Sequence, residues 1–373
     1  MIKLLSLFVV VMFLAFMSHQ MTDNCNRANC KYRIIDDYSY LLMLVIMIFF
    51  AGLRTSYNDT WNYMDGFIKA PGIKEYMSSP DAYNIFKNPL FYFFQSFLRS
   101  LTDNPQWLVF LTSAFTQVCF LKFFKRYSTN FTFTIFLYFT YGTFCFSLAA
   151  IKQVLGMAVV TLAIPYLEKR KWIRYYFLIF IAMLVHTYSI MFAIMPLFSG
   201  RPWKLFTFLL IIIMAVVLSN FREVIENFME QANEFGKTLA DYEVFSENTI
   251  NILRLMVYAV TPMISLIFQK WLFPATSNRL YILVNMSILS LAFMTMGTQA
   301  GANMFARMAT YFELGTICAL PSMLERIFEK KSYRMVSTLA CVLFFIYFVY
   351  SFGINIKFDE ALTLAPIWRL FKR

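Results

Sequence analysis

The stretch Tyr38-Ser-Tyr-Leu-Leu-Met-Leu-Val-Ile-Met-Ile-Phe-Phe-Ala-Gly-Leu53 is followed directly by Arg54-Thr-Ser-Tyr-Asn-Asp59. An almost uninterrupted apolar run that ends at a charged residue is typical of a membrane helix that emerges at the membrane surface. Runs of about 15 to 22 apolar residues recur along the chain, separated by short charged segments. This pattern predicts many membrane helices rather than the short alternating strands of a membrane barrel.

The composition leads to the same fold class. Apolar side chains make up 60% of the 373 residues and charged side chains only 14%, so a soluble core could not hide the apolar surface. We expect an all-α, polytopic integral membrane protein with about 12 transmembrane helices plus juxtamembrane or re-entrant helices. Residues 1–373 are expected to form a single membrane domain, with an outer catalytic loop over residues 54–106 and an outer acidic loop over residues 221–248.

The positive charge predicts the orientation. A formal net charge of +12 would favour a nucleic-acid partner in a soluble protein, but here the basic residues gather in short loops between apolar runs, at residues 122–126, 168–174 and 326–334. By the positive-inside rule these loops are cytoplasmic, as are residues 26–37. The segment 54–88 and Lys152 are then predicted to lie on the outer side, and no nucleic-acid partner is expected.

Four local patterns refine this topology. Residues 4–17 lack a following cleavage site and are expected to be a retained first helix. Residues 89–101 are too short to cross, so they predict a juxtamembrane or re-entrant helix that begins at Pro89. Two helices are predicted near 131–148 and 153–167. The run 175–198 is interrupted at residues 186–189 and could be a single span or a tight hairpin. The hairpin is favoured because it keeps Arg201, Lys204 and the later basic loops cytoplasmic.

The acidic segment 222–247 contains glutamates spaced three and four residues apart, which predicts a solvated amphipathic helix. The six cysteines suggest no disulfide framework, and Cys25 and Cys30 are expected to be free thiols. With only His19 and His186 and no glycine-rich phosphate loop, no metal site and no cofactor are expected. An activated donor for any group transfer would then arrive on a lipid.

Polar residues recur at the predicted outer ends of helices. They are Arg54, Asp59, Tyr63 and Asp65, then Lys152 and Gln153, then His186 and Ser189, and finally Asn303, Arg307 and Tyr311. Each also has a structural explanation, such as a lysine that extends to the interface or an ion pair between helices. Their gathering on one side favours a functional site.

This ordered series resembles the EpsG family of polysaccharide polymerases. The resemblance rests on Arg54 with Asp59-Thr60 and Tyr63, on Asn88-Pro89-Leu90, on Ile151-Lys152-Gln153, on His186-Thr-Tyr-Ser189, and on Asn303 with Arg307 and Tyr311-Phe312. It covers nearly the whole chain. The family usually has Arg-Gln where this chain has Lys152-Gln153, and Glu-Pro where it has Asn88-Pro89. Lysine keeps the charge but loses the two-pronged geometry of arginine.

The resemblance implies a glycosyltransferase of the bacterial inner membrane, a Wzy-like polymerase of O-antigen, capsule or exopolysaccharide. Its substrate would be an undecaprenyl-pyrophosphate-linked glycan, and a chain-length regulator and a flippase would be partners in the same pathway. Arg54, Lys152 and Arg307 would stabilise the departing pyrophosphate, and Asp59 would accept the proton of the attacking hydroxyl. His186 would orient or shuttle that proton, and the remaining polar residues would bind substrate.

Two alternatives stay open on the sequence. A glycosyltransferase that uses a polyprenyl monophosphate sugar would have similar acids and cations in its outer loop. The non-enzyme alternative is a transporter, namely a lipid-linked oligosaccharide flippase. A flippase is expected to have related halves and charges deep in its spans, whereas the charged residues here lie near helix ends.

Overall fold

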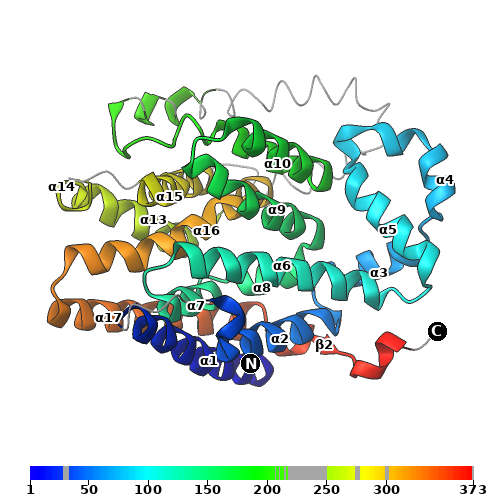
Figure 1. Ribbon diagram of the computed structural model, residues 1–373, viewed down its shortest axis with the longest axis horizontal. Helices are drawn as coiled ribbons and strands as arrows, with labels where there is room; N and C mark the ends of the chain where they lie inside the picture. Colours follow the sequence, from blue (N-terminus) through cyan, green and yellow to red (C-terminus); the bar gives the residue numbers. More distant parts are fainter. Residues whose placement is uncertain are drawn as a thin grey trace. The chain divides into compact units, whose positions relative to one another are not determined.

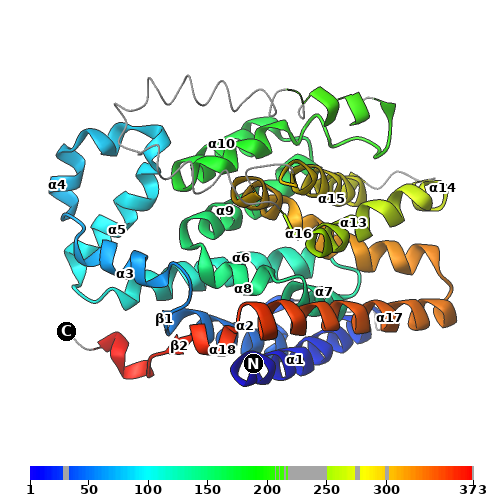
Figure 2. The ribbon, with the colours of Figure 1, turned by 180° about the vertical axis from the view of Figure 1, so that it is seen from behind.

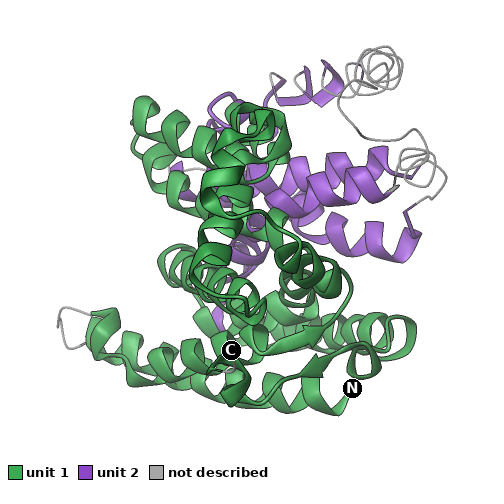
Figure 3. Ribbon diagram, turned by 90° about the vertical axis from the view of Figure 1, so that its right-hand side faces the viewer, with its two compact units in different colours: residues 1–193, 331–373 green, residues 194–330 purple. Residues whose placement is uncertain are grey.

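The computed structural model describes residues 1–27, 33–205, 207–209, 211–213, 216, 250–273, 278–298 and 302–371. The chain divides into two compact units (Figure 3). The first unit contains residues 1–193 and 331–373, and the second contains residues 194–330. Both are helical, apart from one short pair of strands in the first unit.

The long helices of the first unit follow the apolar runs of the sequence (Figure 1). They are α1 (Ile2–Arg27), α2 (Tyr38–Gly52), α6 (Gln106–Tyr127), α7 (Phe131–Thr140), α8 (Thr143–Ala149), α9 (Ile151–Glu168), α10 (Trp172–Val185) and α17 (Lys330–Phe348). Between α2 and α6 lie strand β1 (Arg54–Ser56), the short helices α3 (Thr60–Ile68) and α4 (Ile73–Ser78), and α5 (Pro89–Leu101). After α17 come a π-helix (Val349–Asn355), α18 (Phe358–Ala361), strand β2 (Thr363–Leu364) and a 3-10 helix (Ile367–Phe371).

The second unit is built on α13 (Ile252–Ile267), α14 (Gln269–Leu272), α15 (Asn278–Met296) and α16 (Ala302–Ile327). Helices α15 and α16 pack at close range, because a Cβ atom on Gly315 would lie 2.4 Å from the Cβ atom of Met286. Asn285 of α15 donates hydrogen bonds to the Phe198 and Gly200 carbonyls, which fixes the start of this unit. The predicted acidic loop 221–248 and its amphipathic helix lie outside the described residues.

The described residues include five helices long and apolar enough to cross a membrane: Ile2–Asn26, Gln106–Tyr127, Ile151–Glu168, Asn278–Met296 and Lys330–Asn355. The bent pair α7–α8 would be a sixth, and α2, α10 and α13 are shorter apolar helices. The all-helical membrane fold is therefore confirmed, whereas a count of about 12 spans is not. Helix α5 has 13 residues and begins at Pro89, as the sequence predicts for a helix that does not cross.

One predicted helix is broken. The sequence predicts a continuous helix over residues 131–148, but α7 and α8 are bent by 54° at a break. Gly142, the N-cap residue directly before α8, has φ +94°, a backbone conformation that glycine adopts most easily. A Cβ atom at this position would lie 2.6 Å from the Phe352 ring, so the break also admits a neighbouring aromatic side chain.

The chain turns back after α10. The Tyr175 hydroxyl donates a hydrogen bond to the Phe192 carbonyl, and the Tyr176 hydroxyl lies 3.5 Å from the Ala193 carbonyl. Residues 192–193 therefore lie beside the first turn of α10, which confirms the predicted reversal at residues 186–189. The returning segment, Thr187–Ile194, is a 3-10 helix rather than a second α-helix.

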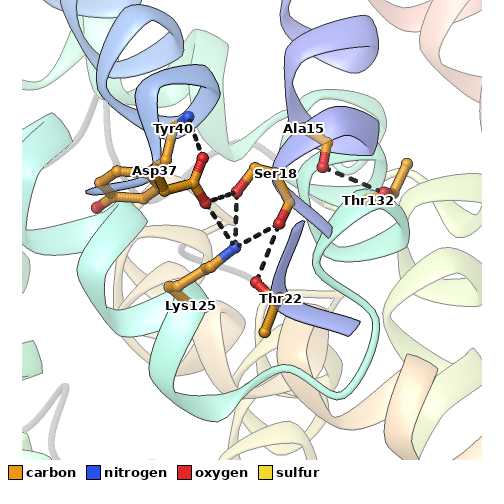
Figure 4. Close-up of polar contacts among 7 residues, drawn as sticks. All are labelled: Ala15, Ser18, Thr22, Asp37, Tyr40, Lys125 and Thr132. Atoms are coloured by element: carbon orange, nitrogen blue, oxygen red, sulfur yellow. Dashed lines mark hydrogen bonds and ion pairs between the residues drawn. The ribbon is translucent and has the colours of Figure 1, made fainter. Parts of the chain in front are cut away.

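At one end of the first unit, a buried polar cluster joins α1, α2 and α6 (Figure 4). The Asp37 carboxylate caps α2 by accepting from the Tyr40 N–H at 2.9 Å, and it accepts from the Ser18 hydroxyl at 2.6 Å. The Lys125 amino group lies 2.6 Å from Ser18 Oγ and 3.4 Å from Asp37 Oδ2. A buried carboxylate requires such partners, so this cluster fixes the three helices to one another.

The basic segments meet at this same end. Arg126, next to Lys125, pairs with Glu168 at 3.5 Å, and the Asn130 amide lies 3.2 Å from the Tyr333 hydroxyl. These contacts bring together α6, the end of α9 and the start of α17. The segments around residues 126, 168 and 333 therefore lie at one end of the first unit, and their cytoplasmic side stays a prediction.

One expectation about cysteine is wrong. Cys25 is disulfide-bonded and is not a free thiol. The free cysteines among the described residues are Cys119, Cys145, Cys318 and Cys341, all within helices. The six cysteines are scattered along the chain, four of them within apolar runs, so the sequence contains no signal that Cys25 is paired.

Candidate functional site

The opposite end of the first unit is organised around the turn that follows α2. Strand β1 pairs antiparallel with β2, so that Arg54 lies opposite Leu364 (Figure 2). The Ala365 N–H also donates to the Leu53 carbonyl at 2.7 Å. From the first turn of α6, Gln106 Nε2 donates to the Gly52 carbonyl at 2.7 Å and to the Arg54 carbonyl at 2.9 Å. The backbone on both sides of Leu53 is thus held in place.

The Arg54 side chain points into the protein and is fully buried. Its Nη1 donates to the Ala51 carbonyl and, at 2.7 Å, to Ser113 Oγ, and its Nε lies 3.2 Å from Thr60 Oγ1. Within the described part of the chain, no carboxylate forms an ion pair with it, and Nη2 makes no hydrogen bond.

Burial lowers the pKa of the Arg54 guanidinium to about 9, while the nearby tyrosines Tyr63 and Tyr57 act in the opposite direction. The group therefore still has its positive charge at neutral pH. A buried charge without an opposite charge is costly, so such a site favours an anion.

Lys152 forms the second cationic group, in the first turn of α9. Its amino group lies 3.1 Å from the Tyr92 hydroxyl, 5.0 Å from the centre of the Tyr92 ring and 5.7 Å from that of Phe91. Contact with aromatic faces stabilises a cation without neutralising it. None of the ion pairs among the described residues involves Lys152.

Tyr63 connects the two cations. The backbone N–H of Lys152 lies 3.4 Å from the Tyr63 hydroxyl, and Tyr63 lies one turn of α3 after Thr60, whose hydroxyl is 3.2 Å from Arg54 Nε. The Tyr63 ring packs edge-on against Phe91 at 6.0 Å between centres. The structure thus brings Arg54, Tyr63 and Lys152 into one neighbourhood from three separate segments of the chain. Gln153, the next residue of α9, is buried.

The two carboxylates of the segment differ in their surroundings. Asp59 is half-buried just before α3, and in the described residues its side chain has no hydrogen bond and no ion pair. Asp59 therefore does not form an ion pair with Arg54, although it follows Arg54 by only five residues. Asp65 instead pairs with Lys69 at 2.6 Å on the exposed side of α3.

Asn88 ties the end of this loop to the turn after α10. Its Oδ1 accepts from the Thr187 N–H at 3.0 Å and from the Thr187 hydroxyl at 3.1 Å. Asn88 has φ +54°, a conformation that asparagine tolerates better than most residues. The neighbouring His186 packs edge-on against Tyr188, and its carbonyl accepts from the N–H of buried Ser189.

Asn303, Arg307 and Tyr311 lie four residues apart on one face of α16. The Arg307 Nε donates to Asn303 Oδ1 at 3.1 Å, and Tyr311 is buried. These residues belong to the second unit. Their meeting with Arg54 and Lys152 therefore stays a prediction.

Sequence reasoning assigned no role to the residues that position the site, namely Gln106, Ser113, Thr60 and Tyr92. A signal was present for two of them. Gln106 and Ser113 are polar residues of an apolar helix, seven positions apart and so on one face. Polar residues inside membrane helices usually have a partner within the protein.

The described residues contain no group of three or more histidines, cysteines or carboxylates that could hold a metal ion. The expectation that no metal or cofactor takes part stays a prediction. Among family models, that of the EpsG family matches residues 37–360. No curated protein and no solved structure matches the chain.

Proposed function

Because the chain belongs to the EpsG family, whose membership indicates a membrane protein of polysaccharide biosynthesis, we propose that it is a polysaccharide polymerase. As a glycosyltransferase, it joins undecaprenyl-pyrophosphate-linked oligosaccharide repeat units on the outer face of the bacterial inner membrane. The bilayer, the lipid-linked glycan and a chain-length regulator and flippase of the same pathway are its partners in this proposal.

One observation supports the proposal most directly. Arg54 and Lys152 lie in one neighbourhood around Tyr63, and neither forms an ion pair with a carboxylate in the described residues. Both are at the end of the first unit opposite the basic segments, which is the outer end by the positive-inside rule. A lipid-linked pyrophosphate is an anion that reaches the protein at this level of the membrane.

The proposed reaction uses these groups as follows. A hydroxyl of the acceptor sugar attacks the anomeric carbon of the donor glycan, and the bond from that carbon to the pyrophosphate oxygen breaks. The bonding electron pair leaves with the pyrophosphate, whose growing negative charge Arg54 and Lys152 stabilise. Asp59 accepts the proton of the attacking hydroxyl, a role that suits a carboxylate without a competing partner.

The other predicted residues have supporting roles. Arg307 adds a third cation from α16, with Asn303 and Tyr311 on the same helix face. His186 orients or shuttles the proton, while Tyr63, Asp65, Gln153 and Ser189 bind the sugars. The aromatic face of Tyr63 also suits stacking against a sugar ring.

The surface polysaccharide of cells that lack this protein tests the proposal. After gel electrophoresis, a single repeat unit on the acceptor is expected in place of long chains, because initiation and export remain intact. The absence of any repeat unit would instead indicate a flippase or an earlier transferase. Restoration of long chains by the intact gene is the control.

A further inference from the structure

Helix α5 has an apolar stripe that the protein does not cover. Phe93, Phe97 and Leu101 follow one another at intervals of four residues, so they share one face of the helix. Their exposed fractions are 40%, 45% and 68%. At a rise of about 1.5 Å per residue, the stripe is about 12 Å long.

The opposite face of α5 contains the polar residues. Gln95 and Ser96 are buried there, together with Phe91 and Leu98. A helix in water would show the reverse arrangement, with polar residues outward. Since α5 is also too short to span, its outer face is suited to apolar chains at the level of the membrane surface.

The stripe begins beside the cationic neighbourhood. Tyr92, whose hydroxyl lies 3.1 Å from the Lys152 amino group, directly precedes Phe93. A phosphate held by Lys152 would therefore place the chain attached to it at the start of the stripe. A cation next to an exposed apolar stripe suits a ligand that has a phosphate head and a long hydrocarbon tail.

We propose that the Phe93–Phe97–Leu101 stripe binds the first part of the polyisoprenoid chain of the lipid-linked substrate. This inference rests on the proposed function and adds the path of the lipid to it. The two phenylalanine rings and the leucine side chain offer apolar area to such a chain, and a phosphate held by Lys152 would fix the position of the chain along the stripe. Bulk phospholipid, in contrast, would contact this stripe in the same way as it contacts the surface of any other lipid-facing helix.

Photo-crosslinking of the full-length protein in vesicles of phosphatidylethanolamine and phosphatidylglycerol tests the proposal. A photoreactive amino acid is placed at position 97, with position 93 as a second reporter of the same stripe. Position 13 of α1 is the matched control, because Phe13 is 62% exposed on a membrane-spanning helix. The probe is radiolabelled undecaprenyl phosphate.

We expect labelling at positions 97 and 93 to exceed that at position 13 about fivefold or more, and to be displaced by unlabelled undecaprenyl phosphate but not by added phosphatidylglycerol. The substitution Lys152→Gln in the position-97 variant should lower the labelling by removing the phosphate anchor. Equal labelling at positions 97, 93 and 13 would overturn the proposal and leave bulk lipid as the occupant.

Failure of this inference can be told apart from failure of the proposed function. If labelling is equal at all positions but cells without the protein make only single repeat units, the polymerase stands and the lipid path is wrong. If the stripe is labelled selectively but the deletion leaves long chains unchanged, the lipid site stands and the polymerase assignment fails.

Discussion

Gln106 Nε2 lies 2.9 Å from the Arg54 carbonyl and also donates to the Gly52 carbonyl, so one amide group holds the backbone on both sides of Leu53. The side chain of Arg54 is held independently through Ser113 and Thr60. Helix α6 thus contributes Gln106 to the backbone and Ser113 to the guanidinium of the same residue. The position of this buried cation depends on α6 as much as on its own segment.

The substitution Gln106→Leu should therefore shorten the polysaccharide chains while the protein remains in the membrane. Two buried carbonyls would lose their donor, at about 1–3 kcal/mol for each unsatisfied group, and the Arg54 turn would shift. Chain length on a gel, normalised to the protein level by immunoblot, measures this effect. Gln95→Leu is the matched control, a buried glutamine of α5 that does not contact Arg54. Equal effects of both substitutions would contradict a specific role of Gln106.

Two substitutions of Lys152 should have opposite effects on the length of the polysaccharide chains. Lys152→Arg should retain long chains, because arginine keeps the charge and is the usual residue of the family at this position. Lys152→Gln should abolish chain extension. Glutamine can still contact Tyr92 and Phe91, but it has no positive charge to stabilise the departing pyrophosphate. The ratio of polymer to single repeat units measures both variants. Long chains in a well-expressed Gln variant would remove Lys152 from the site.

Asp359 predicts a dependence of stability on pH. Burial alone would raise the pKa of its carboxyl, but hydrogen bonds from the chain's amino group and from the Lys3 and Leu4 N–H groups hold it below its ordinary value of 3.8. Because the folded-state pKa is the lower one, the stabilisation is present above pH of about 4 and is lost as the pH falls through the folded-state value. These contacts join α1 to α18, next to the strand that pairs with β1.

Thermal unfolding of the detergent-solubilised protein measures this dependence of stability on pH. A range from pH 3 to 7 brackets the ordinary carboxyl pKa of about 4. The wild-type midpoint should fall as the pH drops below about 4. Asp359→Asn should have a lower midpoint at neutral pH and a weaker pH dependence. The nearby Glu360→Gln is the control. Parallel pH profiles of the wild type and Asp359→Asn would refute the assignment.

The orientation of the first unit can be measured by labelling single cysteines in a cysteine-free background. With an impermeant reagent and intact spheroplasts, position 75 in the loop between α2 and α6 should react, and position 170 in the basic segment after α9 should not. The disulfide at Cys25 favours the opposite orientation, because disulfides persist on the oxidising, outer side of the membrane. The positive-inside rule instead puts the adjacent residues 26–37 in the cytoplasm. Reaction at position 170 alone would resolve this conflict in favour of the disulfide and invert the topology.

The sequence predicts the parts of this protein that local patterns encode. The apolar runs give the membrane helices, and Pro89 with a run of 13 residues gives a non-spanning α5. The break between α7 and α8 could not be predicted, because it depends on the packing of Gly142 against Phe352, which is distant in sequence. Glycine is frequent in membrane helices, so Gly142 alone does not predict a break.

The candidate site shows the same division. Residue types identified Arg54 and Lys152 as cations at helix ends, but their partners come from tertiary contacts. Asp59 is close to Arg54 in sequence, yet the Arg54 guanidinium donates to Ser113 of α6, a partner that the sequence alone does not indicate. The absence of a carboxylate at position 88 was noted, but not that Asn88 caps the turn at Thr187.

Asp59 is the proposed proton acceptor, and the structure sharpens its test. Its carboxylate has no polar partner among the described residues, so Asp59→Asn should leave the fold unchanged while it removes the base. General-base removal lowers rates by about 100-fold or more, which would leave mainly single repeat units. Asp81→Asn is the matched control in the same segment of the chain. Asp81 is paired with Lys87 on the exposed surface, where an ion pair contributes about 1 kcal/mol or less, so this variant should retain long chains. Near-normal polymer from Asp59→Asn at wild-type protein levels would show that Asp59 is not the base and that the reaction relies on its cations.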